Sequence, residues 1–142
     1  MYKILVPVDG SDNALRALQY AVGTAKDHKS PSIHLLTVHP EPVLQGSVTV
    51  YLDSDKLKEV YREQGAVRLK RAAALVEPSG VPCTQEMIFG DIAPTIAGRA
   101  DELGCDVIVM GTRGLSALGS LVLGSIANKV VHLAQRPVTL VK

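Results

Sequence analysis

The chain has 142 residues, with 15 Lys and Arg against 14 Asp and Glu, so no charge excess favours DNA, RNA or an anionic membrane as a partner. It is long enough to bury a core as one domain, residues 1–142, without disulfide or metal support. It shows neither a signal peptide nor an apolar stretch of membrane-spanning length, and we therefore expect a cytoplasmic protein.

Short runs rich in Val, Ile and Leu alternate with longer segments of helical period along the chain. This alternation is typical of an α/β fold, an open parallel sheet with helices on both faces. The expected strands are residues 3–8, 32–39, 83–89, 106–110 and 137–141. The expected helices begin near Ser11, Asp53, Asp91 and Ser125. The first, fourth and fifth strands are almost wholly apolar, which favours burial on both of their faces.

Several features along these elements have structural interpretations. The second helix interleaves both signs of charge, Arg68 included, which is typical of a solvated face. Gly65 in this helix costs about 1 kcal/mol relative to alanine, which suggests tight packing or a slight bend. Cys83 and Cys105 begin strands among apolar residues, and we expect buried free thiols. Prolines and a glycine in the segment 40–51 predict a long loop, a candidate cover for a ligand.

The run Val107-Ile108-Val109-Met110-Gly111-Thr112-Arg113-Gly114 is followed, after nine further residues, by Gly124-Ser125. A buried strand that ends in glycines before a helix leaves backbone N–H groups at its exit, and such groups bind phosphates. Gly111 and Gly114 would allow a positive φ and a close approach to the ligand, and Arg113 is the only cation within the motif. The alternative is that these glycines only form a tight turn and a helix start.

A second group of polar residues lies directly after the end of the first expected strand. The ligand crevice of an open parallel sheet lies at the carboxyl ends of strands where the strand order reverses. If the first and fourth strands are neighbours, Asp9 lies beside Gly111. Its carboxylate suits a ribose hydroxyl, or Mg²⁺ that bridges phosphates, although an aspartate before Gly10 also suits a simple turn. Met110 is expected to pack in the core or to form a wall of the ligand site.

Other nucleotide and catalytic motifs are absent from the sequence. No GxGxxG follows the first strand, which argues against a dinucleotide, and Ser125 stands where a P-loop requires lysine. The four histidines lack metal-ligand spacing, and no serine lies in a GxSxG elbow. We expect no catalytic residue, and weak hydrolysis of a bound nucleotide at most. His39, at a strand exit, is the histidine expected nearest the ligand.

The order Gly-x-x-Gly, nine residues and Gly-Ser, between Val-Ile-Val-Met and a final Pro-Val-x-Leu-Val strand, resembles the universal stress protein family. The resemblance extends to Ile-Leu-Val-Pro-Val-Asp-Gly-Ser at 4–11, Leu-Leu-Thr-Val-His at 35–39 and Phe-Gly-Asp at 89–91. It implies a single-domain, five-stranded parallel sheet of order 3-2-1-4-5. For the subclass that keeps these glycines it also implies binding of ATP.

The resemblance further implies site residues and assembly. It places Pro7, Val8 and Asp9 at the adenine and ribose, and the main chain of Val38 at the adenine edge. The remaining contacts it implies, to the ribose, the phosphates and the walls, come from Met110, Gly111, Arg113, Gly114, Gly124, Ser125 and Ile126. Two copies would dimerise through the strand 137–142 at the sheet edge, unless Lys142 only protects this edge.

The function that we expect is therefore that of an ATP-binding regulatory protein of the stress response, acting as a homodimer. Two alternatives remain open at this point. One is a slow ATPase, and the other is an interaction module of the same fold that binds no nucleotide.

Overall fold

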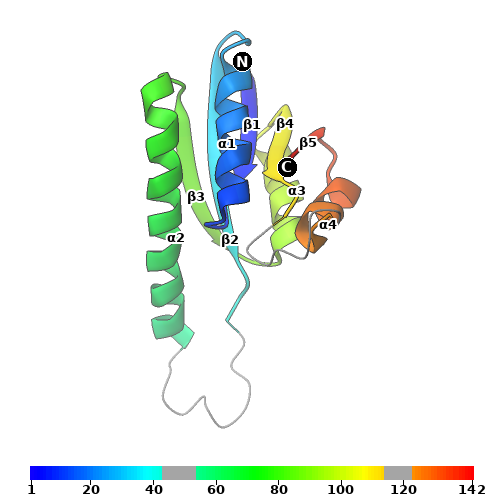
Figure 1. Cartoon of the computed structure of the whole chain (residues 1–142). Helices are drawn as coiled ribbons and strands as arrows, with labels where there is room; N and C mark the ends of the chain where they lie inside the picture. The colour runs from blue at the N-terminus through cyan, green and yellow to red at the C-terminus, as the bar shows by residue number, and fades with distance from the viewer. Residues whose placement is uncertain (43–53, 114–122) are drawn as a thin grey trace.

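The computed structural model describes residues 1–42, 54–113 and 123–142 (Figure 1). Five strands form one sheet in which every pair is parallel, in the order β3-β2-β1-β4-β5. The strands are β1 (Tyr2–Pro7), β2 (Pro31–His39), β3 (Cys83–Phe89), β4 (Val107–Gly111) and β5 (Val138–Val141). The expected fold class and strand order are thus confirmed.

Within the described residues, four α-helices cover the two faces of this sheet (Figure 1). They are α1 (Asp12–Ala25), α2 (Ser54–Val76), α3 (Ile92–Glu102) and α4 (Ser125–Leu133), and a short 3₁₀ helix, Glu77–Ser79, follows α2. Consecutive side chains of a strand point to opposite faces, so each strand contributes to two cores. Ile4 packs in one core with α1 and α2, and Leu5 packs in the other with α3 and α4.

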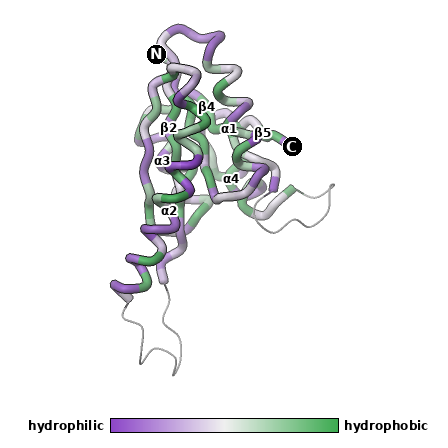
Figure 2. Tube along the Cα trace, turned by 60° about the vertical axis from the view of Figure 1, so that its left-hand side comes forward, coloured by the Kyte–Doolittle hydropathy of each residue, from purple (hydrophilic) through white to green (hydrophobic). Residues whose placement is uncertain are grey.

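Apolar residues concentrate along the central strands, whereas apolar and hydrophilic residues alternate along the helices (Figure 2). The central strands are buried as expected: Ile4, Leu5 and Ile108 are fully inaccessible to solvent. The expectation of burial on both faces is wrong for β5, whose residues are all half-buried, because β5 is an edge strand with a partner on one side only. No helix of the described part combines the length and apolar character that a membrane crossing requires.

The turn between β1 and α1 follows directly from its sequence. Gly10 adopts a φ of 87°, which side chains other than glycine rarely tolerate. The carboxylate of Asp9 accepts the Ser11 N–H at 2.9 Å, and the Ser11 hydroxyl accepts the Ala14 N–H at 3.1 Å. Ser11 therefore caps α1, as its residue type predicted.

Two other expectations have different outcomes. Gly65 packs tightly, as expected, because a Cβ there would collide with the Met87 thioether of β3. Cys105 is buried and is a free thiol, as expected. The expectation for Cys83 is wrong: this thiol is exposed, because Cys83 is the first residue of an edge strand.

Candidate functional site

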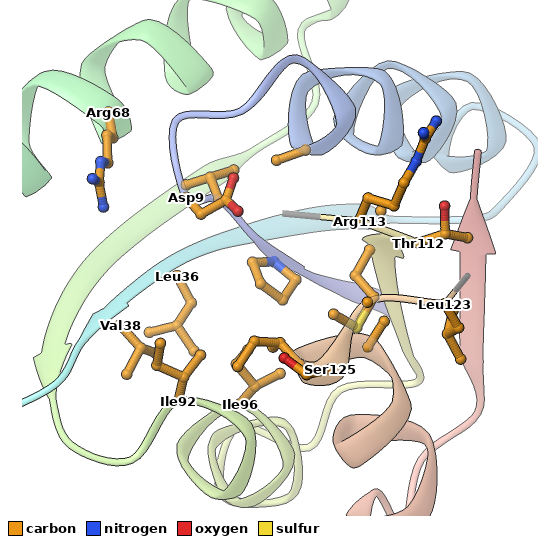
Figure 3. A pocket seen from close by; sticks show the side chains of 18 of the residues that line it. Asp9, Leu36, Val38, Arg68, Ile92, Ile96, Thr112, Arg113, Leu123 and Ser125 are labelled. Carbon is orange, nitrogen blue, oxygen red and sulfur yellow. The ribbon is translucent and has the colours of Figure 1, made fainter. Parts of the chain in front are cut away.

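A cavity of about 620 Å³ lies at the carboxyl ends of β1, β2 and β4, beside the N-termini of α3 and α4 (Figure 3). This volume is typical of a site for a small molecule. Ten of the eleven residues that the sequence singled out line it: Pro7, Val8, Asp9, Val38, Met110, Gly111, Arg113, Gly124, Ser125 and Ile126. Gly114 lies outside the described residues, as does the part of the expected loop beyond residue 42.

One end of the cavity is apolar. Leu36 and Val38 of β2 face Ile92 and Ile96 of α3 there (Figure 3). Sequence reasoning missed Leu36, Ile92 and Ile96 as site residues. Leu36 lies two residues before Val38, on the same face of β2, and Ile92 opens the helix after a strand exit, so both carried a usable signal. Such a wall suits a planar, weakly polar ring.

The start of α4 forms another side of the cavity, where Ser125 lies beside Ile96 (Figure 3). Gly124 is the N-cap residue, and no side chain caps the helix there. The first helical bond runs from the Asn128 N–H to the Gly124 carbonyl, at 3.0 Å. The N–H groups of the first three helical residues therefore have no acceptor within the helix, and no other described residue accepts them. These residues, Ser125, Ile126 and Ala127, all line the cavity, where their N–H groups and the helix dipole favour an anion.

The backbone donors at the exit of β4 are already used within the protein. The Thr112 N–H donates to the Val141 carbonyl at 3.0 Å, and the Arg113 N–H donates to Oδ1 of Asn13 at 2.8 Å. The Gly124 N–H likewise donates to the Thr112 carbonyl, at 2.7 Å. Of these two features, the α4 N-terminus and not the β4 exit therefore supplies backbone donors that no other described residue uses.

The expectation that Gly111 adopts a positive φ is wrong. Gly111 is the last residue of β4 and is not among the residues with positive φ. A side chain is excluded there for another reason, because a Cβ would collide with the side-chain amide of Asn13, whose Cγ would lie 2.7 Å away. Close packing against α1, rather than backbone freedom, requires glycine at this position.

Asp9 and Arg68 lie on the rim of the cavity, on the side of α1 and α2 (Figure 3). Asp9 is held by the N–H of Ser11, at 2.9 Å. Arg68 reaches the rim from α2 by crossing over Gly10, and its Nε would lie 3.2 Å from a Cβ there. Arg68 is therefore half-buried and lines the cavity, a position that its interpretation as part of a solvated face did not include. Its guanidinium has no hydrogen bond or ion pair with another described residue.

Arg113 and His39 also line the cavity, but their side chains are oriented differently. The guanidinium of Arg113 extends away from Ser125, on the side of α1 (Figure 3), so it is not aimed at the α4 N-terminus. His39 lines the cavity, and its ring stacks on Tyr61 of α2 with the ring centroids 3.7 Å apart. Within the described ranges, no group of three or more His, Cys, Asp or Glu side chains is arranged to hold a metal ion.

The whole chain, residues 1–142, matches the model of the universal stress protein family. A universal stress protein of Thermus aquaticus is 39% identical over 145 residues, which cover all of both chains. The solved structure of the protein MJ0577 has a TM-score of 0.86 and 28% identity, and covers 99% of this chain and 95% of its own. The universal stress protein from Archaeoglobus fulgidus in complex with dAMP has a TM-score of 0.67 and 25% identity, and covers 100% of this chain and 98% of its own. The chain therefore belongs to the universal stress protein family.

Proposed function

We propose that this protein binds ATP in the cavity and acts as a regulatory protein of the stress response, whose ligand state alters what it associates with. The observation that carries the proposal is the uncapped N-terminus of α4, with three backbone N–H groups at the cavity. Phosphate oxygens are suited to these donors and to the helix dipole. The dAMP complex of the Archaeoglobus fulgidus relative supports an adenine nucleotide as the ligand class.

The shape and polarity of the cavity suggest one orientation for the nucleotide. The adenine would lie against the apolar wall, with its edge at the main chain of Val38 and with Pro7, Val8 and Met110 as further walls. Asp9 would accept a ribose hydroxyl, close to Gly111. The phosphates would extend to the start of α4, where the proposed contacts are Gly124, Ser125 and Ile126, with Arg113 and Gly114 on the adjoining segment.

Mg²⁺ is the metal that we propose to accompany the phosphates. No described group of three or more ligating side chains could hold it alone. As the alternative to its contact with the ribose, Asp9 would supply one carboxylate oxygen, and phosphate oxygens and water would supply the remaining ligands. Mg²⁺ is ordinarily bound in this way, through one or two carboxylates together with the substrate phosphates.

We also propose that the chain, as a single cytoplasmic domain, forms a homodimer through residues 137–142. β5 pairs only with β4, so the N–H and C=O groups on its outer side have no strand partner within the described sheet. Such an edge is suited to pairing with a second copy. Sedimentation velocity would test this: a protein that stays monomeric at all accessible concentrations, with and without ATP, contradicts the dimer.

Calorimetric titration of the purified protein with ATP and with adenosine tests the proposed ligand. We expect ATP to bind at least about tenfold more tightly than adenosine, because only ATP carries phosphates to the α4 N-terminus. A flat ATP titration with protein shown to be folded by circular dichroism would overturn the proposal. Mass spectrometry of material released by heat denaturation would identify any nucleotide that remains bound through purification.

A further inference from the structure

Asn13, in the first turn of α1, is a buried polar residue that does not line the cavity, and only 6% of its surface is exposed. Its Oδ1 accepts the N–H of Arg113 at 2.8 Å, and its Nδ2 donates to the carbonyl of Val141 at 3.2 Å. Only this orientation of the amide satisfies both partners, because the reverse would pair donor with donor and acceptor with acceptor. One side chain thus joins the exit of β4 to the end of β5.

Gly111 provides the room for this amide. A Cβ on Gly111 would collide with Oδ1 of Asn13 and lie 2.7 Å from its Cγ. The amide therefore packs directly on the backbone of β4, one residue before the segment that leads towards α4. This contact explains why the first glycine of the motif has no side chain although its φ is ordinary.

The hydrogen bonds of Asn13 continue to the start of α4. The Val141 carbonyl accepts the Thr112 N–H at 3.0 Å in addition to the Asn13 amide. The Thr112 carbonyl in turn accepts the N–H of Gly124, the N-cap residue of α4, at 2.7 Å. A continuous chain of hydrogen bonds therefore runs from Asn13, through the end of β5 and the backbone of Thr112, to the proposed phosphate site.

We propose that Asn13 is a positioning residue that holds the α4 N-terminus in place for phosphate and couples this site to the edge strand β5. The inference rests on the proposed function, since it concerns the phosphate end of the same cavity. A phosphate bound at the start of α4 stabilises the backbone conformation of Thr112 and Arg113. The last carbonyl of β5, that of Val141, is hydrogen-bonded to this segment. By thermodynamic reciprocity, a second copy that pairs with β5 changes the affinity for phosphate.

Asn13→Ala, compared with Ser11→Ala, tests the positioning role. Both residues are buried near the start of α1, and Ser11 donates and accepts only within that turn, so its loss destabilises α1 without touching β4 or β5. We expect Asn13→Ala to weaken ATP binding about tenfold and to change adenosine binding less than about twofold. Ser11→Ala should lower the melting temperature and leave both affinities within about twofold of wild type.

Hydrogen exchange of the wild-type protein provides a test that does not depend on whether the variant folds. We expect ATP, and not adenosine, to slow exchange at the amides of Thr112 and Arg113 and within β5. Unchanged exchange in β5 with saturating ATP overturns the coupling. Equal weakening of ATP and adenosine by Asn13→Ala, or no weakening of either, overturns the positioning role. If the wild-type protein binds no ATP, the proposed function fails and this inference fails with it, whereas the other outcomes reject the inference alone.

Discussion

The carboxylate of Glu86 and the guanidinium of Arg99 meet in two hydrogen bonds, from Nε to Oε1 at 2.5 Å and from Nη2 to Oε2 at 3.1 Å. Oε1 of Glu86 also lies 2.9 Å from Nε2 of the buried His34, and Arg99 pairs with Glu102 at 2.8 Å. The cluster connects β2 and β3 to α3. It therefore fixes the helix whose first turns, with Ile92 and Ile96, form the apolar wall of the cavity.

Because of this cluster, we expect the unfolding free energy of the protein to depend on pH. Burial raises the pKa of Glu86, but the hydrogen bonds from Arg99 and His34 outweigh it and hold the pKa below the ordinary value of 4.5. A carboxyl whose pKa is lowered in the folded state contributes stability above its ordinary pKa and loses it as the pH falls through the lowered value. Glu86→Gln should therefore lower the unfolding free energy at pH 7 by about 1–3 kcal/mol, and the difference should shrink below pH 4.5.

Urea unfolding of wild type and Glu86→Gln at pH 7, 5 and 3 measures this difference. Glu102→Gln is the matched control, because Glu102 pairs with the same arginine but its side chain is 66% exposed, against 25% for Glu86. It should cost less than about 1 kcal/mol. A loss for Glu86→Gln that stays constant from pH 7 to pH 3 would contradict the prediction.

Replacement of two helical glycines by alanine should have opposite effects on the unfolding free energy. Gly65→Ala should lower the unfolding free energy by about 1–3 kcal/mol, because the new methyl group would collide with the Met87 thioether. Gly23→Ala should raise it by about 0.5–1 kcal/mol, since a Cβ there meets nothing within 4 Å and alanine favours the helix. Thermal or urea unfolding measures both. Stabilisation by Gly65→Ala would show that Met87 moves aside at little cost.

Ser125→Pro removes one of the proposed phosphate donors from the backbone. Ser125 is the first residue of α4, where proline is well tolerated, and Gly124 before it has a ψ of 152°, as a residue before proline requires. We expect unchanged helix content and about tenfold weaker ATP binding, with adenosine binding unchanged. Ser125→Ala, which loses only the hydroxyl, should weaken ATP less. Equal effects of the two variants would assign the contact to the hydroxyl instead.

Arg68→Ala should weaken both ATP and adenosine by about two- to fivefold. Arg68 lies on the side of Val38 and Leu36 in the cavity (Figure 3), where the adenine is proposed, and a guanidinium over an aromatic ring contributes a cation–π interaction. The control is Arg71→Ala, which removes an exposed arginine of the same helix that does not line this cavity. Calorimetry with both ligands measures the effect. A loss for ATP alone would place Arg68 at the phosphates.

The strands and helices could be predicted because they depend on local patterns. Apolar runs located the strands to within a residue or two at each end, and the residue type of Ser11 located the start of α1. The glycine motif and its resemblance to a family then indicated which strand ends meet. The positions that the motif names at the described strand exits and at α4 do lie around one cavity.

The sequence could not predict contacts that depend on how elements pack. In the sequence, Arg68 is one of many charged residues of α2. Its side chain can cross over to the cavity because Gly10 has no side chain in its path. Asn13 reads as an ordinary residue of a first helical turn, and its two partners lie in the β4 exit and in β5. Nor could the sequence show why position 111 requires glycine. The group that would collide with a Cβ there is the side chain of Asn13, which lies far away in the sequence.

The position of β1 in the middle of the sheet has a consequence for how the molecule folds. β1 can pair with β2 soon after both are synthesised, but its other neighbour is β4, and Lys3 and Asp106, which bond across this boundary, are 103 residues apart. A nascent chain therefore holds β1 with one open side until β4 emerges from the ribosome. Pairing over such sequence distances is slow, and the incomplete sheet is exposed to aggregation during that interval. The sheet is thus expected to be closed on both sides of β1 only after β4 has emerged.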